Sequence, residues 1–126
     1  SEAEIELATS VGLPDGASPE SGAYDGDGRP RANTWQGVFP AINTGDDGFG
    51  GTAPVGCFGP DKLGAYDLIG NVWEWTADEH CPYAADGNAA TPACGSGLKV
   101  IRGGSWRFRA DSARGSRLQH RLPGRA

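Results

Sequence analysis

The sequence predicts one small, folded and loop-rich domain whose regular elements are short. A chain of 126 residues has room for a single domain. Glycine and proline contribute 21 and 9 residues, a proportion that indicates many tight turns. The four tryptophans, three tyrosines and four phenylalanines argue against disorder, because a fully solvated chain has no use for large apolar side chains.

Charge is divided unevenly along the chain, whose net charge is −5. Residues 1–101 carry 15 acidic and 4 basic side chains, whereas residues 102–126 carry 7 arginines and only Asp111 as an acid. The basic end contains no lysine and no nucleic-acid motif, so we expect its arginines to pair with carboxylates of the acidic body rather than with nucleic acid. No apolar run reaches eighteen residues and no signal peptide is visible, so we expect no membrane span.

The stretch Gly64–Thr76 changes from a glycine-punctuated loop to an alternating pattern. In an extended segment Trp73 and Trp75 would share one face, with Glu74 on the other. Two buried indoles would anchor a small core. We expect Glu74 to bind neighbouring backbone rather than to act as a catalytic acid.

Other segments carry local signals. Residues 1–8 alternate like a strand, yet their Ala, Glu and Leu content and the Ser1/Glu4 spacing are typical of a capped helix. Lys99–Arg102 is expected to be a short strand. The run Asp25–Gly28 is interpreted as a turn and not an EF-hand loop, since its twelfth position is Gln36 rather than glutamate.

Few residues offer independent chemistry. Cys81 and Cys94 flank a polar loop that a disulfide could close, which leaves Cys57 unpaired and the redox compartment undetermined. Ser105 lies in no Gly-x-Ser-x-Gly motif, and His80 and His120 are too few for a metal triad. No catalytic residue is therefore assigned.

Several ordered blocks resemble the formylglycine-generating enzyme family, also called sulfatase-modifying factors. The blocks are Ala32–Pro40, Asn43–Phe49, Gly51–Val55, Gly64–Thr76 and Val100–Trp106. The resemblance implies the α+β, C-type-lectin-like fold of that family, with residues 1–126 as the C-terminal portion of one domain. It favours a helix over residues 1–8, where the family has a tryptophan at the position of Ile5. The family domain extends upstream and closes with a Gly-Phe-Arg strand, so we expect the chain to be part of a longer protein.

Two structural calcium sites follow from the resemblance. Oxygen-bearing residues cluster in 33–55, and irregular loops can supply carbonyl oxygens as well as side chains to a hard cation. The first site would use the side chains of Asn33 and Asp47 with the carbonyls of Thr34 and Phe49. The second would use Asp67, often asparagine in the family, with the carbonyls of Leu68, Gly70 and Val72. The alternative is that these polar groups only cap turns.

The catalytic chemistry of the family is not expected here. The family's enzymes oxidise a sulfatase cysteine to formylglycine with copper held by two cysteines, whose positions correspond to Phe108 and Ala113. Neither residue offers the soft thiolate that Cu(I) requires. Copper is therefore not expected as a cofactor, and the chain is interpreted as a non-enzyme.

The segment after Ser105 is instead interpreted as a ligand-binding surface, since arginine and aromatic residues are enriched at recognition sites. Its residues are Trp106, Arg107, Phe108, Arg109, Asp111, Ser112, Arg117, Gln119 and His120. The segment also resembles retroelement-diversified ligand-binding proteins, in which residues 107–125 would form a variable surface. The alternative is an ordinary irregular surface.

Three functions remain open at this point. The first is a non-oxidase homologue that acts as a calcium-stabilised binding or regulatory module. The second is a retroelement-diversified ligand-binding protein. The third is a sulfatase-modifying oxidase that converts cysteine to formylglycine. Neither the ligand, a protein or a small molecule, nor the compartment follows from the sequence.

Overall fold

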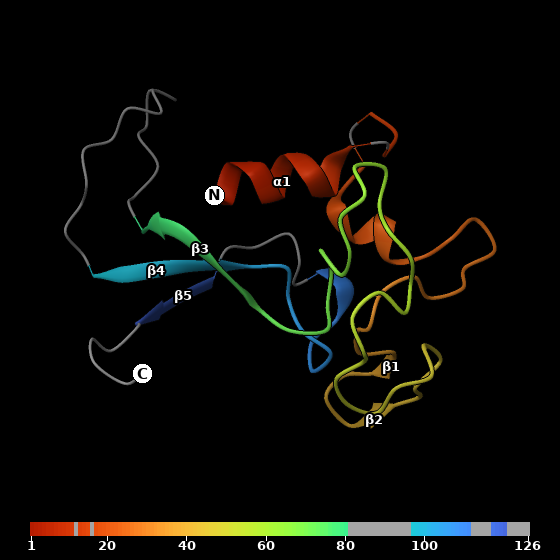
Figure 1. Cartoon of the computed structure of the whole chain (residues 1–126). Coiled ribbons are helices and arrows are strands. Elements are labelled where there is room, and N and C mark those ends of the chain that lie inside the picture. Colours follow the sequence, from red (N-terminus) through yellow and green to blue (C-terminus); the bar gives the residue numbers. More distant parts are fainter. Residues whose placement is uncertain (12, 16, 81–96, 112–116, 121–126) are drawn as a thin grey trace.

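The chain forms a mixed α+β fold in which loops outweigh regular structure (Figure 1). The computed structural model describes residues 1–11, 13–15, 17–80, 97–111 and 117–120. The helices are α1 (Glu2–Ser10) and the 3-10 helix η1 (Pro19–Ala23). The strands are β1 (Gly37–Val38), β2 (Ile42–Asn43), β3 (Glu74–Glu79), β4 (Leu98–Arg102) and β5 (Arg117–His120).

The strands make two separate antiparallel sheets. Strands β3, β4 and β5 form one sheet with β4 in the centre, and β1 pairs with β2 in a small hairpin. The register of β3 against β4 shifts between Trp75 and Glu79. Figure 1 shows the hairpin at the far side of the molecule from the three-stranded sheet, with long loops between them.

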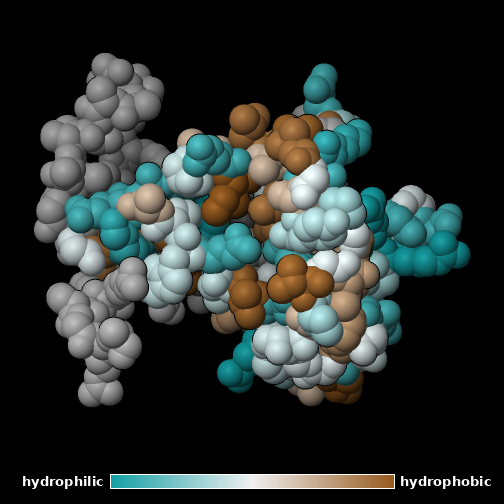
Figure 2. Space-filling view, in the orientation of Figure 1, coloured by the Kyte–Doolittle hydropathy of each residue, from teal (hydrophilic) through white to brown (hydrophobic). Residues whose placement is uncertain are grey.

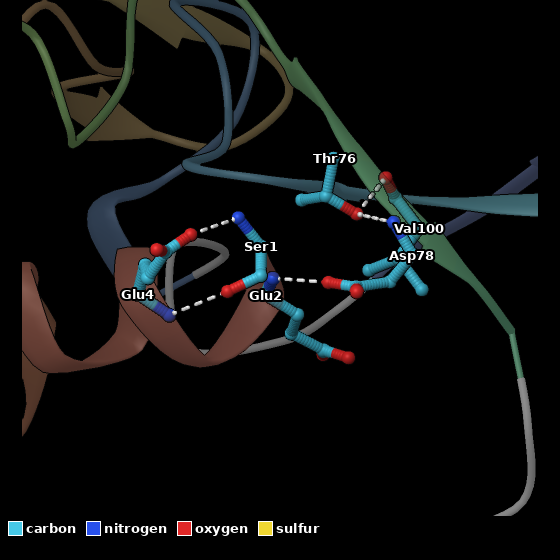
Figure 3. Close-up of polar contacts among 6 residues, drawn as sticks. All are labelled: Ser1, Glu2, Glu4, Thr76, Asp78 and Val100. Atoms are coloured by element: carbon cyan, nitrogen blue, oxygen red, sulfur yellow. Dashed lines mark hydrogen bonds and ion pairs between the residues drawn. The ribbon is translucent and has the colours of Figure 1, made fainter.

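Helix α1 confirms the helical interpretation of the first residues. The Ser1 side chain accepts a hydrogen bond from the Glu4 amide, and the Glu4 side chain binds the Ser1 backbone nitrogen, which completes a capping box. A carboxylate from the sheet also binds this helix end, because the Glu2 amide donates to Asp78 Oδ2 of β3 (Figure 3). An acidic group is favourable there because the first helical amides lack partners within the helix.

Strand β3 corrects the prediction for Trp75, whereas Trp73, which precedes the strand, is half-buried. Trp75 is 51 % exposed, whereas Thr76 is buried and its Oγ1 donates to the Val100 carbonyl of β4 at 3.0 Å (Figure 3). The inward face of the strand therefore carries Thr76 and Asp78. The tryptophan face was expected inside because indoles are large, but α1 and β4 engage the polar face of β3 instead.

The interior is unusually polar. Among the described residues six apolar side chains are buried: Ala23, Ala32, Ala53, Val100, Ile101 and Ala110. Seven polar ones are also buried: Asn33, Thr34, Gln36, Asn71, Thr76, Arg102 and Ser105. Since four of the six apolar side chains are alanine, hydrogen bonds between loops must hold much of the structure together.

The structure confirms three local predictions: a strand, a turn and an ion pair. Strand β4 confirms the expected strand, and Asp25 Oδ1 accepts from the amides of Asp27 and Arg29, as expected of a turn. Arg102 is 4 % exposed and lies 3.7 Å from a Glu2 carboxylate oxygen, which confirms one predicted pairing of the basic end with the acidic body. Cys81 and Cys94, which a disulfide could link, lie outside the described residues.

The surface carries scattered apolar groups. Figure 2 shows brown apolar patches around α1 and toward the middle of this face, separated by polar residues. Exposed examples are Leu7, Val38, Ile42, Val55 and Leu63. None of the described helices combines the length and the apolar character needed to traverse a membrane.

Candidate functional site

The loops around the predicted site meet at the side chain of Asn71. Its Oδ1 accepts from the Ala53 amide at 2.9 Å and from Asn33 Nδ2 at 3.1 Å, and its Nδ2 donates to the Ala53 carbonyl at 3.1 Å. Its backbone amide donates to the Asn33 carbonyl at 2.7 Å, and its carbonyl accepts from the Trp106 amide at 3.0 Å. One buried residue thus connects both predicted calcium loops with the predicted ligand-binding segment.

Gly70 permits this close approach. It has φ +77°, and a Cβ atom added there would lie 2.2 Å from the Asn33 carbonyl oxygen. Asn33 and Gly70 also form an isolated parallel bridge. No side chain larger than hydrogen fits between the two backbones, so the loop at residues 67–72 depends on glycine at this position.

The first predicted calcium set is gathered in one place. Asp47 Oδ2 accepts from the Thr34 amide at 3.1 Å and Gln36 Nε2 at 3.1 Å, and its Oδ1 accepts from the Phe49 amide at 2.9 Å. Asn33 and Thr34 are buried, and Asn33 Nδ2 donates to the Gly51 carbonyl at 2.8 Å. A carboxylate has about four acceptor positions, and three are in use here.

The second predicted set contains one carboxylate, Asp67, with φ +55° in the backbone. Its Oδ2 accepts from the Gly56 amide at 2.8 Å. The carbonyls of Leu68 and Gly70 belong to the same tight loop, and Val72 is 49 % exposed. The sequence predicted that these residues lie near one another because they are only a few positions apart in the chain.

Glu74 interacts electrostatically with Asp67 of the second set and was missed as a ligand candidate. It is half-buried, and this burial raises the pKa of its carboxyl, with the negative charge of Asp67 raising it further. Two acidic groups that disfavour each other's ionised form would be relieved by a cation. The signal in the sequence was the Asp67/Glu74 spacing, and the interaction of the two charges in the structure makes Glu74 a ligand candidate.

The donor chemistry of both sets fits a hard cation. All proposed donors are oxygens, from carboxylates, an amide and backbone carbonyls, which suit calcium. Among the described residues no group of three or more His, Cys, Asp and Glu side chains gathers for a metal ion, so carbonyl oxygens would have to supply part of either site.

Phe108 does not stand alone in the predicted ligand-binding segment. Its ring contacts Trp73 edge-on at 5.9 Å between centroids and stacks on Phe39 at 6.5 Å, and Phe39 in turn contacts Trp35 edge-on at 5.6 Å. The Trp35 amide donates to the Phe108 carbonyl at 2.9 Å. Trp35, Phe39, Trp73 and Phe108 are referred to below as the aromatic cluster.

The aromatic cluster brings together segments that are far apart in the sequence. Phe39 is 43 % exposed, and Trp35 Nε1 is buried with no hydrogen-bond partner in the described part of the chain. Trp35 and Phe39 come from the loop that carries the first predicted calcium set, whereas Phe108 follows Ser105. Local sequence gives no indication that these two residues would meet Phe108, which is about 70 positions further along the chain.

Charged side chains border the aromatic cluster. Arg107 and Arg109 are exposed; the Arg107 guanidinium lies 5.6 Å from the Trp106 ring centroid, and Arg109 Nε lies 3.8 Å from Asp111 Oδ2. The ion pair between Arg109 and Asp111 is exposed and contributes little to stability. Ser112 and Ala113 lie outside the described residues, as do the side chains of Arg117, Gln119 and His120 in β5.

The chain is similar in sequence to several known proteins. The chain is 43 % identical over 108 residues to the formylglycine-generating enzyme of Mus musculus, covering 83 % of this chain and 29 % of that protein. It is 49 % identical over 77 residues to the protein of the same name from Thermomonospora curvata, covering 61 % and 25 %. It is 37 % identical over 119 residues to the inactive C-alpha-formylglycine-generating enzyme 2 of Mus musculus, covering 94 % and 34 %.

The chain therefore spans about a quarter to a third of the length of these relatives. The family match covers the whole chain, because residues 1–126 match the sulfatase-modifying factor enzyme 1-like domain. The glycine-dependent loop at Gly70, the polar connection at Asn71 and the Gly103–Trp106 segment are thus features of a chain that belongs to the sulfatase-modifying factor enzyme 1-like domain family.

Proposed function

We propose that this chain is a non-oxidase member of its family that acts as a calcium-stabilised binding module on a C-type-lectin-like fold. The observation that carries the proposal is the position of Phe108. Where a copper-binding cysteine is expected for an oxidase, the chain has a ring packed against Phe39 and Trp73.

The chemistry of Phe108 supports binding rather than oxidation. A phenyl ring cannot ligate Cu(I), which favours thiolates, and cannot form a mixed disulfide with a substrate thiol. The name of the mouse relative at 37 % identity, inactive C-alpha-formylglycine-generating enzyme 2, supports the idea that family members need not be oxidases.

The surroundings of Phe108 favour recognition of a ligand. Aromatic rings supply a large contact area at low cost in conformational entropy, and arginines are common at binding hot spots. Arg107 and Arg109 are exposed beside the aromatic cluster. A ligand with an apolar part and an acidic group would match this combination.

The oxidase alternative is tested directly with a peptide that contains Cys-x-Pro-x-Arg, incubated with the chain, oxygen and added copper. We expect no aldehyde by mass spectrometry, while the mouse formylglycine-generating enzyme serves as the positive control. Aldehyde formed by the unmodified chain would refute the proposal. A variant with both Phe108→Cys and Ala113→Cys tests in addition whether the absence of these two cysteines alone accounts for the absence of oxidation.

Calcium is proposed to act structurally, by tying together loops that have few ladder hydrogen bonds. A site filled at a hundredfold excess of calcium over its Kd adds about 2.7 kcal/mol to the free energy of unfolding. We expect calcium, compared with EGTA, to raise the Tm, and Asp47→Asn and Glu74→Gln each to reduce this rise. Asp27→Asn, at an exposed turn, is the matched control.

The Glu74→Gln variant distinguishes a calcium site beside Asp67 from two repelling carboxylates that bind no calcium. If calcium binds beside Asp67, Glu74→Gln weakens calcium binding about tenfold or more, since a charged ligand is lost. If no calcium binds there, the same substitution removes only repulsion and raises the Tm in EGTA and in calcium alike. The second result would remove the second site from the proposal.

A retroelement-diversified ligand-binding protein is the second candidate, favoured by the exposure of Arg107 and Arg109. Sequencing the DNA on both sides of the coding region tests it. A nearby near-copy of the codons for residues 103–126, differing mainly at adenines, supports diversification. Without such a copy, the fixed binding module remains the proposal.

A further inference from the structure

The loop that carries the second predicted calcium set is joined by backbone hydrogen bonds to the stretch that leads into the ligand-binding segment. The Gly70 amide donates to the Gly103 carbonyl at 2.7 Å, and the Trp106 amide donates to the Asn71 carbonyl at 3.0 Å. The loop therefore holds both ends of the stretch 103–106.

Gly103 also lies against a carbonyl of this loop. Its φ is +92°, and a Cβ atom added there would lie 3.2 Å from the Leu68 carbonyl oxygen. A separation of that size is tighter than most contacts of a real Cβ atom, so one of the two backbones would have to move. The position of the Leu68 carbonyl and the path of the chain at Gly103 thus depend on each other.

The predicted calcium carbonyls alternate with the peptide groups that bind this stretch. The ligand carbonyls would come from Leu68, Gly70 and Val72. The peptide group between the first two carries the amide that donates to Gly103, and the next intervening one carries the Asn71 carbonyl. Each peptide group is planar, so only the dihedral angles at the Cα atoms are free. A cation that fixes alternate carbonyls would therefore restrict the groups between them.

The far end of the stretch is held by the loop of the first predicted set. The Trp35 amide donates to the Phe108 carbonyl at 2.9 Å, and the Phe108 amide donates to the Ser105 carbonyl at 2.9 Å. The two calcium loops are themselves connected, because the Asn71 amide donates to the Asn33 carbonyl at 2.7 Å. The placement of Phe108 in the aromatic cluster therefore depends on both loops.

We propose that calcium bound at the second predicted set orders the stretch 103–106 and thereby sets the position of Phe108 in the aromatic cluster. This inference rests on the proposed calcium-stabilised binding module and adds that calcium controls the ligand-binding surface itself. The two states differ in the hydrogen bonds of Gly103 and Trp106 to the loop, which open more often without calcium. By linkage, a change that disturbs the stretch must also weaken calcium binding.

Hydrogen exchange of the Trp106 amide, followed by NMR, measures the opening of this stretch without any ligand. In EGTA we expect Trp106 to exchange faster than the amides of β4, which shows that it opens locally. Calcium should slow its exchange by about fivefold or more, with a midpoint equal to the Kd from calorimetry. The Gly28 amide, which donates to the Asp25 carbonyl in an exposed turn, should not change.

Asp67→Asn assigns the effect to the second predicted set. Asparagine tolerates the positive φ of this position, and its oxygen can still accept from the Gly56 amide, while the charge is lost. We expect the calcium midpoint at Trp106 to rise by about tenfold or more, since a charged ligand is removed. Asp27→Asn, at an exposed turn, should leave the midpoint unchanged.

Gly103→Ala tests the linkage from the opposite side, because Gly103 is not a predicted ligand. We expect its calcium Kd to rise by about fivefold or more. Gly28→Ala is the matched control: Gly28 also has positive φ, but a Cβ atom added there meets nothing within 4 Å, so the Kd should not change. If Gly103→Ala does not fold, Trp106 exchange in the unmodified chain and in Asp67→Asn still decides.

The proposal is overturned if calcium binds and raises the Tm while the exchange of Trp106 stays the same. It is equally overturned if Trp106 opens only together with β4, if Asp67→Asn leaves the midpoint unchanged, or if a folded Gly103→Ala binds calcium as tightly as the unmodified chain. These results would leave the structural role of calcium intact. A chain that binds no calcium would overturn this inference and the calcium part of the proposed function together.

Discussion

Asn71 offers the sharpest test of how this polar interior is held together. Asn71→Ala removes three side-chain hydrogen bonds and leaves the buried amide and carbonyl of Ala53 without their partner. Each buried unsatisfied group costs about 1–3 kcal/mol. Asn71 also has φ +57°, where alanine costs about 1–2 kcal/mol.

Together these terms predict a loss of about 3–8 kcal/mol in the free energy of unfolding, against a total of about 5–15 kcal/mol for a typical domain. The assay is urea unfolding followed by tryptophan fluorescence. The neighbouring Val72→Ala is the control; its side chain is 49 % exposed, and we expect a change within about 0.5 kcal/mol.

Asn71→Gly separates hydrogen bonding from backbone strain, because glycine adopts positive φ readily. We expect it to retain a loss of at least about 2 kcal/mol from the two unsatisfied groups of Ala53. If Asn71→Gly is as stable as the unmodified chain, the reasoning fails, since the hydrogen bonds of Asn71 then contribute nothing measurable.

Two further predictions concern backbone fit and pH. Gly70→Ala should abolish cooperative unfolding or cost more than any change at Asn71, because its Cβ would lie 2.2 Å from the Asn33 carbonyl oxygen; an unchanged urea midpoint would contradict this. Hydrogen bonds from the Arg29 amide, and less strongly the Asp27 amide, lower the pKa of Asp25. The contribution of this turn to stability is thus fully present above the ordinary pKa of an aspartate and is lost as pH falls through the lower folded-state pKa. NMR titration of Asp25 should give a midpoint below that ordinary value, and a midpoint at or above it would contradict the assigned bonds.

Elements stabilised by near neighbours were predictable. The Ser1/Glu4 capping box, the turn at Asp25 and strand β4 all depend on residues within a few positions of each other. The family blocks were equally readable, since the complete domain match extends over them. The assignment of the calcium ligands and of the binding surface stays a prediction.

Other features could not be read from local patterns. The alternation around Trp75 identified an extended segment but selected the wrong inner face, because the contacts that choose the face come from α1 and β4. The electrostatic interaction of Asp67 with Glu74 was likewise not predicted. Which face of a strand is buried depends on the groups from elsewhere in the chain that pack against it. The alternating pattern alone does not identify that face.

The family, the loop-rich character, the capped helix and the absence of thiols at Phe108 and Ala113 follow from the amino-acid sequence, because they depend on residue identity and short-range geometry. The contacts of Phe108 with Phe39 and Trp73, and the bonds by which Asn71 links three loops, emerge only when the chain is folded. The interior is polar and holds few large buried side chains, so individual hydrogen bonds between residues far apart in the chain direct the packing.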